Sequence, residues 1–312
     1  MVNSNSSAAL PATSKIRELF GLIAYQAKAL SHNGTAGILR ICDEYDAILT
    51  RYSGLRLTQA KTFEIGFGTR AGIMIALTSL GVDAYGVDLD VPLLGGSPAD
   101  LLEMYRKNGL ERAAKSAIRF VLFDFFWKAS LAKNLARRGA KVIMPARSRL
   151  LVRDAASVDW PDRSFDLITS ESVFEHIPVP SLEILVAKMS RWLKRGGLAL
   201  IRPDVFTGIS GAHLLEWFDL NPRRRRKSEP WEHLRKKRYR GNVYLNELHR
   251  KDYRRLFSSH FEILEESVLY PDQGREFFSP EVARDLASYD EGELFSNGVM
   301  FVLRPKSSGS HG

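Results

Sequence analysis

The sequence has little cysteine and no long apolar run, and each absence narrows the class of protein. Cys42 is the only cysteine among 312 residues, so neither a disulfide framework nor a cysteine zinc site can form within one chain. Cys42 falls on an apolar helix face, which predicts burial rather than reactivity. No segment approaches the ~20 apolar residues of a membrane-spanning helix. Together these absences favour a cytoplasmic protein.

The N-terminus lacks the basic start and apolar centre of a secretory signal. We expect a disordered leader at 1–14 and a disordered tail at 306–312, because both are rich in serine and other small or polar residues. Apolar residues at helical spacing predict a helical extension over 15–56. The remaining residues, 57–305, form one expected domain with an insertion at 204–258.

Metal-binding motifs are also absent. The sequence has no H-x-x-x-H and no close Asp/His cluster with ligand spacing. We therefore expect no metal site.

The stretch from Lys61 to Asp90 predicts a strand, a glycine turn, a helix and a second strand. Gly66 and Gly68 allow the tight turn, and the second strand ends at Asp88. A glycine turn that opens a helix exposes backbone N–H groups and the positive end of the helix dipole. An acid at the end of the next strand can accept hydrogen bonds from ribose hydroxyls. The stretch therefore predicts half of a nucleoside-cofactor site.

Two cofactor classes fit this half-site. Gly66, Gly68 and Ala71 satisfy the dinucleotide pattern G-x-G-x-x-[G/A], and Asp88 follows at about the expected 20 residues. Glu64 favours a different cofactor, because a carboxylate at the strand end would face the anionic pyrophosphate of NAD. The same carboxylate suits a cofactor with an α-amino group and a sulfonium.

Further motifs follow in a fixed order: Arg149–Asp154 with Ala155, Pro161–Ser170, Phe174–Pro178 and Leu193–Ile201. Together with the run Glu64–Gly68, this order resembles the class I S-adenosylmethionine-dependent methyltransferases, in their broad small-molecule branch. The resemblance covers Lys61 to Pro203. Arg70 departs from it, because the family often has a third glycine there.

Strands that alternate with helices predict an α/β fold with a parallel sheet. We expect a Rossmann-like, seven-stranded, mostly parallel sheet with an antiparallel last strand and helices on both faces. The expected strands are 62–65, 84–87, 148–153, 165–170, 198–202, 261–269 and 299–303. An aromatic patch in the helices between the second and third strands is expected mainly in the core, or as a wall of the acceptor pocket: Phe120, Phe123, Phe125, Phe126 and Trp127.

The resemblance implies roles for several residues. Glu64, Gly66, Phe67 and Gly68 would line the methionine and ribose end of S-adenosyl-L-methionine, Asp88 would hold the ribose hydroxyls, and Leu89 would lie beside the adenine. Asp154 and Ala155 would meet the adenine edge, and Ser170 would lie near the amino acid moiety. Two alternatives stay open: Asp154 could cap the following turn, and Glu64 could be a structural acid.

Methyl transfer from a sulfonium is an in-line displacement, so the enzyme mainly aligns and desolvates the acceptor. An oxygen acceptor must also lose a proton, for which histidine is the commonest base. His176, after the fourth strand, and His213, in the insertion, are the candidate catalytic residues. The alternative for His176 is a structural role in its loop. Ser170–Val173 lacks the Asn/Asp-Pro-Pro-aromatic motif, which argues against methylation of an exocyclic base amine.

Basic residues concentrate in one stretch. Residues 221–255 contain 14 Lys and Arg against four Asp and Glu, so their net charge of +10 exceeds the +9 of the whole chain. Three interpretations stay open: a solvated surface, a site for an anionic acceptor such as a diphosphate-linked glycan, or contact with nucleic acid or an anionic membrane face. Nucleic acid is the least favoured partner. The runs Trp231–Arg235 and Asn242–Asn246 are similar to methyltransferases of surface-glycan assembly.

The sequence thus predicts an S-adenosylmethionine-dependent methyltransferase that O-methylates a sugar, a glycan or another polar small molecule. Two alternatives compete with it. The first is a nicotinamide-dependent oxidoreductase, and the second is a non-catalytic adaptor that binds RNA or a membrane through 221–255.

Overall fold

The computed structural model describes residues 34–218, 225–239 and 243–306. The predicted leader, the helix predicted near 16–30 and the tail from 307 on lie outside these residues. In chain order the strands are β1 (Lys61–Ile65), β2 (Asp83–Asp88), β3 (Leu150–Val152), β4 (Phe165–Glu171), β5 (Leu193–Arg202), β6 (Phe261–Val268) and β7 (Val299–Pro305). The α-helices are α2 (Gly34–Ser53), α3 (Gly72–Ser79), α4 (Pro98–Arg119), α5 (Phe125–Ala136), α6 (Val179–Trp192), α7 (Glu232–Arg235), α8 (Arg250–Ser258), α9 (Pro280–Asp285) and α10 (Glu291–Leu294).

All seven strands form one sheet in the order β3-β2-β1-β4-β5-β7-β6. The pairs from β3 to β5 are parallel, whereas β7 runs antiparallel to both of its neighbours, β5 and β6. The predicted mixed sheet with an antiparallel last strand is therefore confirmed. The carboxyl ends of β1, β2, β4 and β5 share one edge of the sheet, where ligands bind in such folds.

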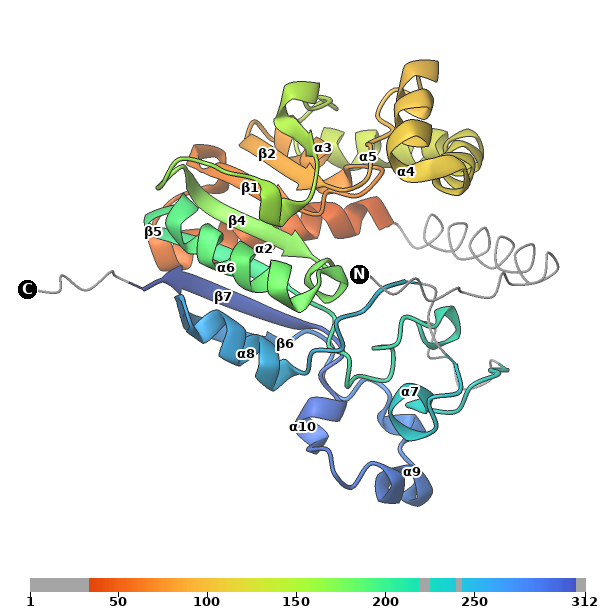
Figure 1. Cartoon of the computed structure of the whole chain (residues 1–312). Coiled ribbons are helices and arrows are strands. Elements are labelled where there is room, and N and C mark those ends of the chain that lie inside the picture. The colour runs from red at the N-terminus through yellow and green to blue at the C-terminus, as the bar shows by residue number, and fades with distance from the viewer. Residues whose placement is uncertain (1–33, 219–224, 240–242, 307–312) are drawn as a thin grey trace, which may run out of the picture.

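Helices cover both faces of the sheet (Figure 1). One buried cluster joins α2, α3 and α5 to the sheet, and a second joins α6 and α8 to its other face. Cys42 of α2 lies in the first cluster with 1% of its surface exposed, and burial raises the pKa of its thiol to about 12. The predicted burial of Cys42 is confirmed.

The connection from β2 to β3 is a bent helical arm. Gly109, with φ 84°, interrupts α4 at the point where the sequence predicts that a helix over 100–108 ends. A short π-helix, η2 (Phe120–Asp124), then joins α4 to α5. A π-turn adds one residue to the helical repeat, so it rotates the side chains that follow. As a result, Trp127 is buried while Phe125 and Phe126 are 73% and 62% exposed. The expectation that the aromatic patch is core is wrong for these two phenylalanines.

A separate lobe stands beside the carboxyl edge of the sheet (Figure 1). It is built from two stretches of chain, one following β5 and one following β6, and its apolar centre consists of Ile209, Trp217, Trp231, Val282, Leu286, Leu294 and Phe295. The predicted insertion 204–258 is thus divided, because its last helix, α8, packs on the sheet through Tyr253 and Phe257. None of the helices in the described residues is long and apolar enough to span a membrane.

Candidate functional site

The glycine turn brings β1 close to the segment that follows β4. Gly66 has φ 88° and Gly68 has φ 66°, a backbone region that favours glycine. A Cβ on Gly66 would lie 2.1 Å from Val173 Cγ2, whereas a Cβ on Gly68 would meet no atom within 4 Å. Gly66 is therefore required twice, for its backbone conformation and for its close approach to Val173.

Asp88 ties the end of β2 to the glycine turn. Its two carboxylate oxygens accept hydrogen bonds from the backbone N–H groups of Gly68 and Asp90, each at 2.7 Å. Burial raises the pKa of Asp88, and the two N–H donors oppose that shift. Each carboxylate oxygen keeps a further lone pair, so the side chain can still accept ribose hydroxyls. Leu89 is 66% exposed beside it and offers an apolar surface to a base.

Two glutamates lie near the ends of β1 and β4, beneath α2: Glu64 is fully buried and Glu171 is partly buried. Glu64 accepts a hydrogen bond from the Thr169 hydroxyl through one oxygen, and its other oxygen, Oε1, is buried without a partner. Glu171 accepts hydrogen bonds from Tyr45 Oη at 2.6 Å and Arg202 Nη1 at 3.3 Å. Burial raises the pKa of Glu64 to about 8 and that of Glu171 to about 7. An incoming cation would favour the ionised forms, so this pair fits an ammonium and a sulfonium.

Other predicted cofactor residues have clear structural positions. Phe67 is buried and packs close to Gly86, so only its backbone faces the turn. The Ser170 hydroxyl donates to the Ile65 carbonyl oxygen at 2.9 Å and joins β4 to β1. Asp154 accepts a hydrogen bond from Ala156 N and caps the 3₁₀ turn η4 (Ala155–Ser157), as the alternative interpretation proposed. Ala155 packs against the second core cluster. Contacts of these residues with the cofactor stay predictions.

Arg70, the residue that departs from the family pattern, points toward the helical arm. Its Nε donates to Asp124 Oδ1 at 2.7 Å, and its guanidinium lies 5.7 Å from the centre of the Trp127 ring. Asp124 is 1% exposed and also pairs with Arg119, whose guanidinium in turn donates to the Thr69 hydroxyl. The side chain therefore fastens the glycine turn to the junction of η2 and α5.

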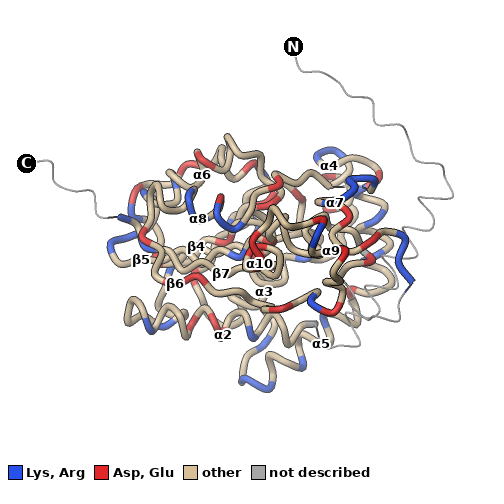
Figure 2. Tube along the Cα trace, turned by 90° about the horizontal axis from the view of Figure 1, so that it is seen from below, with Lys and Arg blue, Asp and Glu red and all other residues tan. Residues whose placement is uncertain are grey.

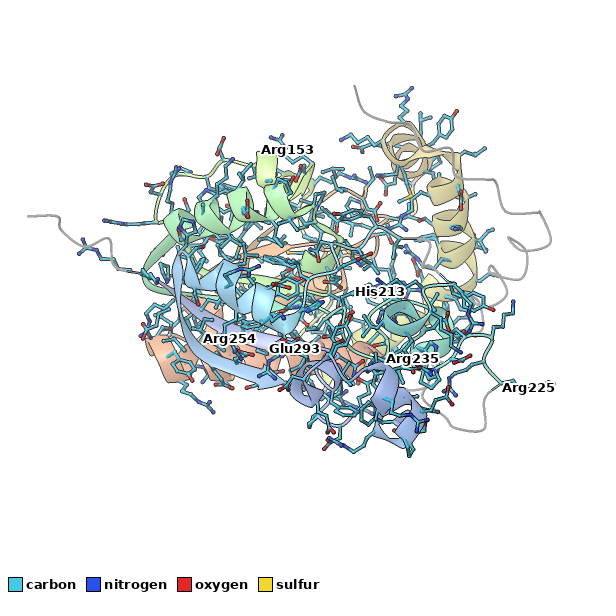
Figure 3. All side chains as sticks on the ribbon, turned by 60° about the horizontal axis from the view of Figure 1, so that its bottom comes forward. Arg153, His213, Arg225, Arg235, Arg254 and Glu293 are labelled. Atoms are coloured by element: carbon cyan, nitrogen blue, oxygen red, sulfur yellow. The ribbon has the colours of Figure 1, made fainter. Side chains whose placement is uncertain are left out.

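The two predicted catalytic histidines meet at the same edge of the sheet. His176 ends the 3₁₀ turn η5 (Phe174–His176) after β4, and His213 lies in the lobe, facing inward between the lobe and the sheet (Figure 3). Their ring centres are 4.9 Å apart. Burial lowers the pKa of His176. His213 has φ 54°, a strained conformation for a residue with a side chain.

Two carboxylates complete this group, which we call the His/carboxylate cluster: Glu175, His176, Asp204 and His213. Glu175 Oε1 lies 3.8 Å from His176 Nε2 and 4.0 Å from His213 Nε2. Asp204 Oδ2 lies 3.4 Å from His213 Nε2. Burial and the nearby Asp204 carboxylate raise the pKa of Glu175 well above its usual range. Glu175, His176 and His213 have the composition and proximity of metal ligands.

A cavity of about 630 Å³ opens in the lobe next to the His/carboxylate cluster. Tyr244 lines it and accepts a hydrogen bond from His176 Nδ1 through its carbonyl oxygen at 2.9 Å. Ala212, the neighbour of His213, lines it as well. The other lining residues are Phe206, His233, Leu234, Lys237, Tyr239, Val243, Leu245, Glu247, His249 and Tyr289. Tyrosine rings and polar groups thus share the wall.

The sequence interpretation missed Glu171, Glu175, Asp204 and Tyr45. Glu175 stands directly before His176 in a motif that was already singled out, and Asp204 follows the proline that ends β5. Both positions were therefore visible as strand-end acids. Tyr45 carries no such signal, since its hydroxyl reaches Glu171 only through the packing of α2.

Many basic side chains of 221–255 are paired within the protein. Arg235, with 2% of its side chain exposed, bridges Glu229, Glu281 and Asp285. Arg238 pairs with Glu229 and Glu232. Figure 2 shows basic and acidic residues interspersed around α7 and α9, whereas Arg225 extends away from the lobe in Figure 3. The described part of this stretch is therefore largely a network of ion pairs.

Comparisons with known proteins agree with this architecture. Residues 109–201 match the model of a family described as a methyltransferase domain, a region that spans β3, β4, α6 and nearly all of β5. No protein of curated function matches the sequence.

Solved structures with a similar fold have low sequence identity. An S-adenosylmethionine-dependent methyltransferase from Mesorhizobium loti is 15% identical, with 83% of this chain and 96% of that chain covered and a TM-score of 0.41. The YcgJ protein of Bacillus subtilis is 15% identical, with 84% and 98% covered and a TM-score of 0.41. The PH0226 protein of Pyrococcus horikoshii is 15% identical, with 83% and 87% covered and a TM-score of 0.40. At this sequence identity and these TM-scores, the similarities support no conclusion by themselves.

The strand order with antiparallel β7, the glycine turn tied to Asp88 and the methyltransferase-domain match over residues 109–201 together support a class I S-adenosylmethionine-dependent methyltransferase. The chain is an enzyme, and its cofactor is S-adenosyl-L-methionine. The residues present fit that cofactor, because Gly68 has open space beside its backbone and Glu64 has a buried oxygen without a partner. The nicotinamide and non-catalytic alternatives are therefore set aside.

Proposed function

We propose that the enzyme O-methylates a sugar, a glycan or another polar small molecule. The observation that carries this proposal is the cavity beside His176 and His213, whose wall combines Tyr239, Tyr244 and Tyr289 with polar side chains. Such a wall suits a hydroxylated molecule, because tyrosine rings offer an apolar face together with a hydrogen-bonding group. Bound S-adenosyl-L-methionine supplies an electrophilic methyl group on a sulfonium.

His176 and His213 are the proposed catalytic residues. A hydroxyl group is a weak nucleophile, so it must lose its proton as the new O–CH₃ bond forms. The histidines lie at the carboxyl edge of the sheet, on the side of the lobe cavity, where an acceptor in the cavity would present its hydroxyl. The His/carboxylate cluster then draws off the hydroxyl proton, and the cavity wall positions the acceptor and excludes water.

An anionic acceptor is the more specific form of this proposal. Lys237 and His249 line the cavity and can face a phosphate, whereas Glu247 is the one acid among the described lining residues. His233 also lines the cavity, but burial lowers its pKa to about 4 and its Nε2 lies 2.8 Å from the Phe206 carbonyl oxygen. The acceptor class that fits is a sugar carrying a phosphate or diphosphate. We retain the cytoplasmic location as a prediction consistent with such metabolites.

The test is methyl transfer to a panel of neutral sugars, sugar phosphates and nucleotide-linked sugars. Mass spectrometry would detect a gain of one methyl group, and NMR would locate it on oxygen. We expect turnover with at least one phosphorylated sugar and its loss in Asp88→Ala, which should bind S-adenosyl-L-methionine at least tenfold more weakly because a charge-assisted acceptor is lost. Methylation on nitrogen or carbon only, or cofactor binding without transfer to any hydroxyl, would refute O-methylation.

A further inference from the structure

Two imidazoles and two carboxyl groups converge in the His/carboxylate cluster. His176 and His213 each direct a ring nitrogen at Glu175 Oε1, at 3.8 and 4.0 Å, and His213 Nε2 lies 3.4 Å from Asp204 Oδ2. The ligand atoms of Glu175, His176 and His213 all lie within 4.8 Å of one another. The residues come from two loops, one after β4 and one after β5. These loops place the ligand atoms of Glu175, His176 and His213 around one point at the sheet edge, with Asp204 beside His213.

The Tyr244 carbonyl fixes the tautomer of His176. A carbonyl oxygen can only accept, so His176 Nδ1, 2.9 Å away, must carry the proton and donate it. In the neutral ring, Nε2 then carries no proton, and its lone pair is directed at the Glu175 carboxyl group. A histidine held by a backbone carbonyl through one nitrogen, with the other nitrogen free, is the usual arrangement of a metal-ligating imidazole.

Glu175 and His213 lack the partners that buried polar groups normally have. Glu175 is 3% exposed, and neither of its oxygens has a hydrogen-bond partner. The backbone N–H groups of Glu175 and Asp204 and the Asp204 carboxyl group lie close to it. His213 Nε2 is likewise buried without a partner. Among the described residues, the ion-pair partners of Glu175 and Asp204 are His176 and His213, and no Lys or Arg pairs with either acid.

We propose that His176, His213, Glu175 and Asp204 bind one divalent transition-metal ion. Ligands about 2.1 Å from a tetrahedral ion lie about 3.4 Å apart, so the observed separations need only a small contraction. Two imidazoles and two carboxylates suit Zn²⁺ or Mn²⁺, whereas Mg²⁺ and Ca²⁺ prefer oxygen ligands alone. The expectation of no metal site came from close sequence spacing, which cannot report ligands that come from two separate loops.

The proposed role of the ion rests on the proposed O-methylation. An acceptor hydroxyl that binds the ion becomes a stronger acid and releases its proton to water. The oxygen then forms the O–CH₃ bond while the sulfonium C–S bond breaks and leaves its electron pair on sulfur. In this arrangement the histidines activate the hydroxyl through the ion.

The first experiment measures metal binding by the full chain after treatment with EDTA and dialysis. Calorimetry with ZnCl₂, MnCl₂ and MgCl₂, and elemental analysis after gel filtration, give affinity and stoichiometry. We expect one equivalent of Zn²⁺ or Mn²⁺ and at least tenfold weaker binding of Mg²⁺. Asp204→Asn and His213→Gln should each weaken binding at least tenfold. The control His260→Gln changes an exposed histidine on the surface and should bind like the wild type.

The second experiment separates this proposal from the proposed function. Circular dichroism first establishes that each variant folds. His213→Gln should lose the metal and keep S-adenosyl-L-methionine binding, whereas Asp88→Ala should lose the cofactor and keep the metal. Absence of saturable binding, or equal binding in wild type and both ligand variants, overturns the metal site even if O-methylation is found. Metal binding without methyl transfer to any hydroxyl would support the metal site and refute the proposed O-methylation.

Discussion

At the scale of single residues, Gly66 and Gly68 have similar backbone conformations but different surroundings. Both have φ in the left-handed region, yet only Gly66 lies against another side chain, Val173. The pattern G-x-G predicts the turn without distinguishing its two glycines. The difference depends on where the segment after β4 passes, which is a tertiary contact that sequence spacing does not encode.

This contrast gives the first prediction. Gly68→Ala should cost about 1 kcal/mol of stability, because only the left-handed backbone is strained. Gly66→Ala should cost clearly more and weaken cofactor binding, because its Cβ must also displace Val173. Chemical denaturation and calorimetry measure both effects. Gly66→Ala with Val173→Ala should recover part of the loss, and equal effects of the two single variants would contradict the contact.

Glu64 gives a prediction about pH. Its pKa is raised to about 8 by burial, with Glu171 and Asp88 adding to the shift and Arg202 opposing it. Between the usual glutamate pKa and about 8, the folded protein holds a proton that the unfolded chain has released. The free energy of unfolding therefore falls as pH rises through this window. Glu64→Gln removes this contribution. The melting temperature of the variant relative to that of the wild type should therefore increase from pH 5 to pH 8.

The measurement is a melting curve at each pH in the absence of cofactor. Glu262→Gln, at an exposed position on β6, is the matched control and should follow the wild type. Parallel curves for Glu64→Gln and wild type would show that Glu64 is already ionised in the folded protein.

At the scale of elements, the strands were predictable because the apolar runs and the turn residues beside them indicate the same strand boundaries. Six of the predicted strands match within a few residues, and the fifth, predicted at 198–202, begins earlier, at Leu193. The break at Gly109 was predictable as well. The π-helix η2 was not, because the same apolar residues fit an uninterrupted α-helix. The exposed Phe125 and Phe126 follow from that single extra residue.

The junction of η2 and α5 carries the third prediction. Asp124 is buried between Arg70 and Arg119, whose side chains are 20% and 16% exposed. Asp124→Ala leaves both guanidinium groups without this carboxylate, and loss of one partner of a buried ion pair costs about 3 kcal/mol. Because Arg70 lies in the glycine turn, cofactor affinity should fall too. Lys115→Ala, which removes an exposed pair with Glu111, should change stability by less than about 0.5 kcal/mol.

At the scale of the whole molecule, the site joins regions far apart in the sequence. The cofactor half was predictable because the carboxyl ends of parallel strands share one edge, which brings Gly66 and Asp88 together. The acceptor half was not, because His213 and Asp204 approach Glu175 only when the lobe folds back over that edge. The two histidines could be predicted as candidates, but their contact could not.

The lobe carries the fourth prediction. Arg235 joins its two stretches of chain through Glu281 and Asp285 of α9. Arg235→Ala should increase hydrogen exchange in α7 and α9 while the sheet stays protected. The reason is that the buried Arg235 guanidinium connects these two helices and makes no ion pair with the sheet among the described residues. Arg255→Ala, which removes an exposed pair with Asp252, is the control. Increased exchange throughout the sheet would mean that the lobe and the sheet unfold together.

The place of β7 in the sheet has a consequence for synthesis. Among the described strands, β7 is the last in the chain, yet it lies between β5 and β6 and is the only strand that pairs with β6. While the chain is still emerging from the ribosome, β5 presents an open edge, and β6 has no strand to bind. Such edges invite pairing with other chains. A frameshift or early stop before Val299 would therefore release a polypeptide that already holds the glycine turn but tends to aggregate.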